Sequence, residues 1–327
     1  LFRSKDQAKL MASISDISTQ STEVNPSVRR SPLRLAWKIF REWPILPGIV
    51  MGALVIAAVF APFFAPAEFR TQSLADKNHA PVWFSDAEPT ERDIAKGRDP
   101  AGLYRLGADA FGRDVLTRVI FGARVSLQMV LIALTSGVII GTGLGLAAGY
   151  WGGWIDELIS RIVDFWLALP FIMVAMVVAI VWGQSFTIIL ILLALLAWSP
   201  FVRNVRAEVL TLKQRDYVSM ARVYGASDWR ILTRHLLPGV TNTVVVLATL
   251  RVGSLILAEA SLSFLGIGIP PPTPAWGLMV AEGRQWLTTA WWISFFPGLA
   301  IFLIVMSLNF FGDWLRDKLD PRLRQIE

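Results

Sequence analysis

Cysteine is absent from the 327-residue chain, and histidine occurs only twice, as His79 and His235. Without cysteine the chain has no disulfide, iron–sulfur cluster, thiolate zinc site or cysteine nucleophile. Two histidines are too few for a multi-histidine metal site. Charged residues are also scarce, at 17% against roughly a quarter in soluble domains, whereas 54% of the residues are hydrophobic. The composition predicts a membrane protein.

Long uncharged runs mark the segments that are expected to cross the membrane. A helix needs about 20 mostly apolar residues to span roughly 30 Å of hydrocarbon. The longest run, residues 165–202, would measure about 57 Å as one helix, so we expect it to fold back at residues 183–185. Four prolines between residues 270 and 274 exclude a regular helix there. Six spans are predicted, at residues 45–64, 125–149, 162–182, 186–202, 244–265 and within 285–312.

The distribution of lysine and arginine predicts the orientation. With the N-terminus inside, 20 of these 31 residues lie on the inner side, 10 lie on the outer side, and Arg251 lies within a span. Nine of the outer ten occur in one long loop that also carries nine acidic residues, so they have little weight in the positive-inside rule. Both termini are therefore expected in the cytoplasm. The polar, serine-rich first 30 residues are expected to form a flexible tail rather than a cleavable signal.

These features predict an all-α polytopic membrane protein with six transmembrane helices. Pro170 and Pro200 lie within or at the end of spans and are expected to bend them. The predicted parts are a cytoplasmic tail (1–44), a first transmembrane helix (45–66), an extracytoplasmic loop (67–124), a core with five transmembrane helices (125–313), a cytoplasmic loop within that core (203–240), and a C-terminal cytoplasmic tail (314–327).

The loop 203–240 is too periodic to be an irregular connection. Apolar residues recur at helical spacing at positions 205, 209 and 212, and again at 217, 220, 221 and 224. Gly225 can end one helix and Ser227 or Asp228 can cap the next, which Pro238 is expected to stop. Composition alone leaves two interpretations of these short amphipathic helices. They could lie flat on the membrane, or they could dock into a groove on a cytoplasmic partner.

The residue order of this loop resembles a known signature. The segment DYVSMARVYGASDWRILTRHLLP is similar to the cytoplasmic loop of bacterial binding-protein-dependent ABC importer permeases. In that family the pattern is Glu-Ala-Ala, three residues, Gly, nine residues, Ile, one residue and Leu-Pro. The matching positions here are Ala221, Gly225, Leu237 and Pro238. Ser219 and Met220 replace Glu-Ala, and His235, usual in the peptide-import branch, replaces Ile.

Other segments resemble the same branch, the dipeptide and oligopeptide (C-type) permeases. The sequence LGADAFGRDVLTRVIFGARVSL is similar to the stretch before their second span, and YWGGWIDELISRIVDFWLALP is similar to the next inner turn. Residues 260–279 and 311–324 resemble the outer loop and the C-terminus, and residues 43–66 match the extra first helix. The resemblance therefore extends over most of the chain from residue 106 onwards.

The resemblance implies a type I ABC importer fold and the role of a permease subunit for dipeptides or oligopeptides in a bacterial or archaeal plasma membrane. The implied partners are a second permease subunit in a heterodimer, two ABC ATPase subunits, an extracytoplasmic peptide-binding protein and the lipid bilayer, with no nucleic acid. No Gly-x-x-x-x-Gly-Lys-[Ser/Thr] motif occurs in the sequence. The chain is thus expected not to be an enzyme and to bind no cofactor, since ATP and Mg would be bound by the ATPase subunits. The implied coupling residues are Tyr217, Ser219, Met220, Ala221, Arg222, Gly225, Ala226, Ser227 and Pro238.

Two ionisable residues within the fifth span are candidates for the translocation pathway. An ionised side chain at membrane depth is by default a functional residue, which applies to Arg251 and Glu259. They are eight residues apart, roughly 80° around a helix, so a direct pair within the helix is not expected. Arg251 could instead extend its charge to the interface, and Glu259 lies in a stretch typical of the family, which favours a structural role.

Glycines at four-residue intervals mark one face of the second span. Gly137, Gly141, Gly145 and Gly149 form three overlapping Gly-x-x-x-Gly units, which indicate close helix packing. The helix that packs against them could belong to this chain or to the second permease subunit.

Other functions remain as alternatives. The same branch of permeases also includes transporters of nickel, glutathione and oligosaccharides. A secondary transporter or channel would also be polytopic, but internal repeats and several buried carboxylates, which are usual in such proteins, are not evident. A membrane-embedded enzyme would need a serine or paired aspartates within the spans, and Asp164 alone does not provide them.

Overall fold

The computed structural model describes residues 45–65, 68–84 and 104–319. The chain divides into a unit of residues 1–43 and a unit of residues 44–327, and the described residues all belong to the second. The predicted tail 1–44 and the last eight residues of the predicted C-terminal tail lie outside the described residues. Within the described part, the regular elements are helices and the only strand-like feature is one isolated bridge, between Ala108 and Asp114. The prediction of an all-α fold is confirmed.

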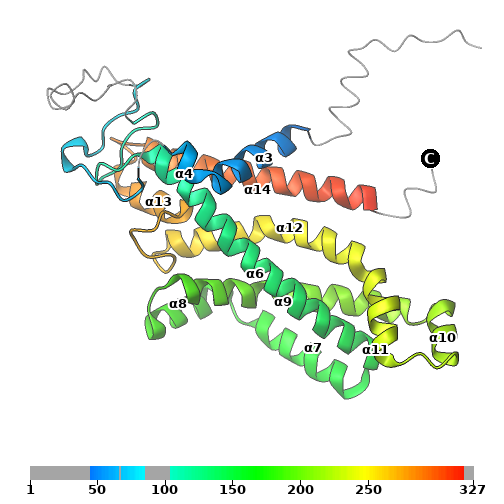
Figure 1. Cartoon of the computed structure of the whole chain (residues 1–327). Helices are drawn as coiled ribbons and strands as arrows, with labels where there is room; N and C mark the ends of the chain where they lie inside the picture. The colour runs from blue at the N-terminus through cyan, green and yellow to red at the C-terminus, as the bar shows by residue number, and fades with distance from the viewer. Residues whose placement is uncertain (1–44, 66–67, 85–103, 320–327) are drawn as a thin grey trace, which may run out of the picture. The chain divides into compact units, whose positions relative to one another are not determined.

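Within the described residues, four helices are long and apolar enough to cross a membrane, and Figure 1 shows their arrangement. They are α6 (Val115–Trp151), α9 (Phe186–Leu212), α12 (Leu237–Phe264) and α14 (Trp292–Leu319). A bent pair of helices, α7 and α8, supplies a fifth candidate span. The apolar helix α3 (Ile45–Val59) is shorter, with 15 residues, and α4 (Ala61–Phe64) follows it. The count of six spans therefore stays a prediction that requires α3 to cross the membrane as well.

The prediction of one helix over residues 162–182 is wrong. The chain forms α7 (Gly153–Ala168) and α8 (Phe171–Trp182), which meet at an angle of 81°. Leu169 is extended, with φ −85° and ψ 128°, because the ring of Pro170 disfavours the helical conformation of the residue before it. The predicted turn after Trp182 is confirmed, since α9 begins at Phe186 and Ser185 Oγ accepts a hydrogen bond from the Ile188 amide at 3.2 Å.

Several helices extend beyond the predicted spans. Helix α6 begins at Val115, ten residues before the predicted start and inside the predicted loop 67–124. Its N-cap is Asp114, whose Oδ2 accepts hydrogen bonds from the Thr117 amide at 2.7 Å and the Thr117 hydroxyl at 2.6 Å. Helix α14 continues to Leu319, into the predicted tail 314–327. The predicted and observed helix ends differ because uncharged runs mark only the part of a helix inside the hydrocarbon layer. Arginine and lysine are good helix formers, so the helix continues past them.

The glycine face of α6 packs against α9 of the same chain. A Cβ atom added to Gly137 would lie 2.5 Å from Ala197 Cβ, and one added to Gly141 would lie 2.4 Å from the carbonyl oxygen of Trp198. Added Cβ atoms at residues 145 and 149 would lie 2.8 and 2.7 Å from the Cβ atoms of residues 205 and 209. Of the two interpretations of the Gly-x-x-x-Gly units, packing within the subunit therefore holds.

This contact predicts a contrast between two glycines on one helix. Gly141→Ala should lower the stability of the protein by about 1–3 kcal/mol, because the new methyl group meets backbone atoms of α9. A Cβ atom added to Gly143 would have no neighbouring atom within 4 Å, so Gly143→Ala should be neutral or stabilising. The thermal unfolding temperatures of the two purified variants measure the difference. Equal temperatures would contradict the assigned helix contact.

Candidate functional site

One end of the bundle carries two short helices, α10 (Asp216–Val223) and α11 (Asp228–Ile231), as Figure 1 shows. Helix α10 ends in a Schellman motif, in which the Ala226 amide donates to the Ala221 carbonyl at 3.0 Å and the Gly225 amide donates to the Arg222 carbonyl at 3.0 Å. Gly225 adopts φ +75°, a conformation that glycine adopts without steric cost. The predicted helix end at Gly225 is confirmed.

The second short helix has the predicted cap. Ser227 Oγ accepts a hydrogen bond from the Arg230 amide at 3.4 Å, which places Ser227 at the N-cap of α11. A π-helical turn, η3 (Leu232–Leu236), then joins α11 to α12. Residues 228–264 therefore form one helical run, and the prediction that Pro238 stops a helix before the fifth span is wrong. Pro238 lies in the first turn of α12, where a missing amide hydrogen is tolerated, and the wider π turn precedes it.

Apolar packing ties α10 to the long helices. Val218 is fully buried, and its neighbours form one apolar cluster drawn from α6, α9, α11, η3 and α12. The other buried members of that cluster are Tyr150, Val205, Val209, Ile231, Leu232, Leu236 and Val240. Because such packing tolerates little relative movement of the side chains, a displacement of α10 is transmitted to these helices.

Polar contacts reinforce the same connection. The Tyr150 hydroxyl at the end of α6 donates a hydrogen bond to Asp228 Oδ1 at 2.6 Å, and Lys213 Nζ donates to the Gly149 carbonyl at 2.8 Å. Arg206 of α9 forms a two-pronged ion pair with Asp156 of α7. Helices α6, α7, α9 and α11 are thus linked near the attachment of α10.

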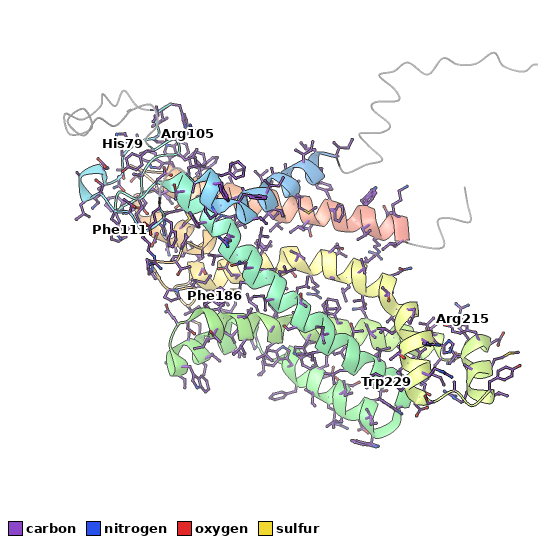
Figure 2. The ribbon with its side chains drawn as sticks, viewed as in Figure 1. His79, Arg105, Phe111, Phe186, Arg215 and Trp229 are labelled. Atoms are coloured by element: carbon purple, nitrogen blue, oxygen red, sulfur yellow. The ribbon has the colours of Figure 1, made fainter. Side chains whose placement is uncertain are left out.

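The outward side of the two short helices is apolar and exposed. We call it the α10 apolar surface, and its members are Tyr217, Met220, Val223, Tyr224 and Trp229. Val223 is 85% exposed, Tyr224 86% and Trp229 75%. The same segment carries four exposed arginines, Arg215, Arg222, Arg230 and Arg234; Figure 2 shows Arg215 and Trp229 at this end. A cluster of large exposed apolar side chains with a charged rim is typical of a protein-binding surface.

The structure brings most of the predicted coupling residues together. Tyr217, Ser219, Met220, Ala221 and Arg222 lie on α10, and residues 225–227 form the turn between the two short helices. Pro238 lies apart from them, on α12. Among the described residues, no three histidine, aspartate or glutamate side chains are placed to hold a metal ion.

The two pathway candidates occupy different environments on α12. Glu259 is buried and accepts hydrogen bonds from Ser263 Oγ at 2.8 Å and from Ser126 Oγ of α6 at 3.2 Å. It therefore joins α12 to α6 inside the chain. Arg251 is half-buried, and no carboxylate of the described residues forms an ion pair with it. The expectation that the two do not pair directly is in agreement with these contacts.

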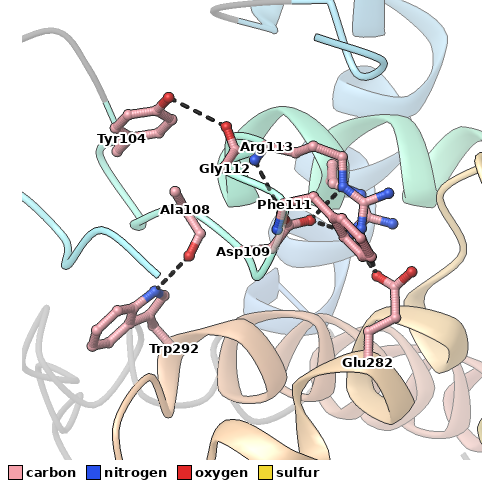
Figure 3. A network of polar contacts seen from close by, with 9 residues as sticks. Tyr104, Ala108, Asp109, Phe111, Gly112, Arg113, Glu282 and Trp292 are labelled. Atoms are coloured by element: carbon pink, nitrogen blue, oxygen red, sulfur yellow. Dashed lines mark hydrogen bonds and ion pairs between the residues drawn. The ribbon is translucent and has the colours of Figure 1, made fainter. Parts of the chain in front are cut away.

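A charged network at the opposite end of the bundle was not predicted (Figure 3). Asp109 Oδ2 accepts from Arg113 Nε and from Arg118 Nη1, each at 2.6 Å. Glu282 of α13 (Trp276–Gly283) accepts from the same two guanidinium groups, at 3.0 and 2.7 Å. Arg118 is fully buried and Asp109 is 1% exposed, so the network ties the start of α6 to α13.

Backbone contacts complete this region. Asp109 Oδ1 accepts hydrogen bonds from the amides of Phe111 and Arg113, at 2.8 and 3.0 Å, and the Trp292 indole donates to the Ala108 carbonyl at 3.1 Å. Burial raises the pKa of the neighbouring Asp114 carboxyl, although hydrogen bonds from Thr117 act in the opposite direction. The acidic and basic residues of the segment LGADAFGRD were the available signal in the sequence, but their partner Glu282 lies 169 positions from Arg113.

The fold and this site define a membrane permease subunit, and comparison with known proteins supplies its family. The sequence profile described as "Binding-protein-dependent transport system inner membrane component" matches residues 141–325. The chain belongs to this family. It is therefore a component of an inner membrane transport system.

Relatives with similar sequences extend the match to most of the chain. A glutathione transport system permease protein of Pectobacterium atrosepticum is 37% identical over 297 residues, which cover 90% of this chain and 93% of that protein. A dipeptide transport system permease protein of Alkalihalophilus pseudofirmus is 37% identical over 296 residues, which cover 90% and 91%. A chain from a structure of a methionine ABC transporter in inward-facing conformations has the same fold, with a TM-score of 0.51, 19% identity, and coverage of 63% of this chain and 97% of that chain.

Proposed function

We propose that this chain is a permease subunit of an ATP-driven importer for dipeptides or oligopeptides, small peptides such as glutathione included. Its sequence relatives are named as permeases of dipeptide and glutathione transport systems. The observation that carries the proposal is the α10 apolar surface, which is exposed although its helix is firmly packed on the bundle. Nickel or oligosaccharide transport is the alternative within the same branch.

The proposed complex contains a second, different permease subunit, two ABC ATPase subunits and an extracytoplasmic solute-binding protein. In this arrangement the α10 end of the bundle faces the cytoplasm, and α10 and α11 dock into grooves of the ATPase subunits. ATP and Mg bind to the ATPases, which is consistent with the lack of a phosphate-binding Gly-x-x-x-x-Gly-Lys-[Ser/Thr] loop in this sequence. The chain itself then performs no hydrolysis.

The mechanism that follows from the packing is mechanical. When ATP binding brings the ATPase subunits together, α10 moves with them. Val218 and its apolar cluster transmit that displacement to α9 and α12, because close-packed side chains shift together rather than deform. The bundle then changes its tilt relative to the second permease subunit and exposes the pathway alternately to the two sides.

Substitution of one exposed apolar residue tests the docking role. Val223→Asp should remove the ATPase subunits from the purified complex, because a desolvated carboxylate would replace an 85% exposed valine of the α10 apolar surface. The measurement is co-purification of ATPase subunits with a tagged permease. Since Val223 contributes little to the core, the variant chain should be inserted at the wild-type level.

Leu74 provides the matched control. It is 74% exposed and lies in the short 3-10 helix η2 (Leu74–Asp76), outside the bundle helices. Leu74→Asp should retain the ATPase subunits. If the wild-type chain purifies without any ATPase subunit, the proposed docking role of α10 and α11 fails. If Val223→Asp retains them fully, docking occurs elsewhere on the chain.

A further inference from the structure

A groove with a volume of about 420 Å³ opens between α3 and α6, and α12 and α14 form its floor. Four residues of α3 line one side and six residues of α6 line the other. The floor consists of Val252, Ile304 and Leu308. Three of these four helices, α6, α12 and α14, are among the described helices that are long and apolar enough to cross a membrane, so the groove lies at the depth of the hydrocarbon layer.

The lining of the groove has one polar part. Eleven of its thirteen residues are apolar, and the two polar residues, Arg124 and Gln128, are one helical turn apart on α6. From Arg124 the apolar stripe of α6 continues through Leu127 and Leu131 to Leu134, about 15 Å farther along the axis. The Arg124 cation and the Gln128 amide lie beside a continuous apolar channel. This arrangement is complementary to an amphiphile that has an anionic head group and a hydrocarbon tail.

Arg124 has no anionic partner within the described part of the chain, because the ion pairs of this region involve other arginines. Arg118, six residues earlier on α6, contacts two carboxylates. An unpaired guanidinium at the edge of the hydrocarbon layer is costly unless an anion or water reaches it.

Arg124 lies near the charged end of α6. The Trp276 indole donates to the Val119 carbonyl of α6 at 2.9 Å, and the Phe121 ring lies 4.9 Å from that of Phe69. Trp276 is fully buried, so these contacts pack the start of α6 against neighbouring segments of the chain. The charged network around Arg118 lies six residues, or about 9 Å, before Arg124 on α6. The Arg124 side chain can therefore reach a headgroup phosphate at the end of the hydrocarbon layer.

We propose that this groove is a specific binding site for one anionic phospholipid. Arg124 and Gln128 bind the phosphate, and an acyl chain lies between α3 and α6. Apolar side chains of another subunit would fill the channel but would leave both polar groups without partners in a low-dielectric setting. A phosphate supplies acceptors for both, as charge-assisted hydrogen bonds. The lipid then completes the packing of α3, whose 15 residues measure only about 22 Å.

Lipid analysis of the purified importer tests the proposal. The full complex is extracted in a mild detergent, and phosphatidylglycerol and cardiolipin that remain bound after extended washing are measured by mass spectrometry. Arg124→Gln should reduce the retained anionic lipid about tenfold or more, since a charge-assisted contact is lost. Arg124→Lys keeps the positive charge and should retain most of the bound anionic lipid.

Two tryptophan variants separate the groove from the remaining lipid-facing surface. Leu131→Trp should block the channel and reduce the retained lipid, because Leu131 lines the groove. Ile139→Trp places the same side chain two turns farther along α6, at a position with similar exposure outside the groove, and should have no effect. Equal lipid retention in wild type, Arg124→Gln and Leu131→Trp would overturn the proposal.

A crosslinking measurement distinguishes protein occupants. The chain contains no cysteine, so Leu131→Cys introduces a unique thiol in the groove. No crosslink to the second permease subunit, or to residues 1–43 of this chain, is expected within the membrane-embedded complex. An efficient crosslink to either would show that protein fills the groove and would overturn the lipid assignment, while the proposed transport function would be unaffected.

Discussion

Gly225→Asp is expected to abolish transport while the chain is still inserted in the membrane. The substituted residue must adopt φ +75°, which costs roughly 1–2 kcal/mol for a residue with a side chain. That cost is small compared with a typical stability of about 5–15 kcal/mol. Apart from the adjacent residues, no atom of the described part of the chain lies within 4 Å of the position of the new Cβ, so the carboxylate projects from the turn toward the proposed ATPase. The measurements are transport in vesicles and ATPase co-purification.

Gly266 provides a control for backbone strain. It has φ +76°, follows α12 in an equivalent Schellman motif, and also has open space where a Cβ atom would be added. Gly266→Asp therefore introduces a similar strain at the opposite end of the bundle. It should retain the ATPase subunits at the wild-type level, whereas Gly225→Asp should lose them. Wild-type transport by Gly225→Asp would exclude the assigned docking turn, and equal loss of the ATPase in both variants would indicate a general folding defect.

Arg118→Met is expected to destabilise the opposite end of the bundle strongly. Arg118 is fully buried and contacts Asp109 and Glu282. Its removal leaves two carboxylates that share only Arg113, and breaking a buried ion pair in this way costs about 3–5 kcal/mol. The effect is measured by the thermal unfolding temperature of the purified complex and by the rate of proteolysis at the start of α6.

Two further variants give this prediction a clear outcome. Arg161→Met breaks the ion pair between Arg161 and Glu157, whose side chains are 77% and 64% exposed, respectively. This substitution should lower the stability by at most about 1 kcal/mol. Adding Glu282→Gln to Arg118→Met removes the surplus negative charge and should restore part of the lost stability. If Arg118→Met and Arg161→Met have equal effects, the buried network does not stabilise this region.

The order and approximate positions of the apolar segments could be predicted from the sequence, because the hydrocarbon layer admits few charges, whereas the count of six spans stays a prediction. The helix ends could not be predicted from the same signal, since α6 continues through Arg118 and Arg124, and α14 continues beyond Asp313. Lipid thickness determines where charge is excluded, while backbone hydrogen bonding determines where a helix ends.

Local chemistry was informative where it acts within a few residues. Gly225 and Ser227 ended and capped helices as expected, because both effects depend on nearby backbone groups. The prediction for Pro238 is wrong, because proline is tolerated in the first turn of a helix and a π turn precedes it.

Contacts between segments that are distant in the chain could not be predicted from the sequence. The pairing of Arg118 with Glu282 depends on the packing of α13 beside α6, and the glycine face of α6 could have met either this subunit or another. In the candidate site, helical periodicity predicted short amphipathic helices. It could not show that Val218 is buried while Val223 is exposed.

The length of α6 has a geometric consequence for communication between the two ends. Its 37 residues form a continuous rod of about 55 Å, with Arg118 held in the Asp109 network and Tyr150 bonded to Asp228. A rotation of such a rod by about one degree around one end shifts the other end by about 1 Å. Small angular changes at the α10 end are thereby converted into ångström-scale displacements at the far end. Labels at the two ends of α6 would report these displacements as one correlated change of angle. In the neighbouring span, the 81° junction of α7 and α8 is a place where the chain can bend instead.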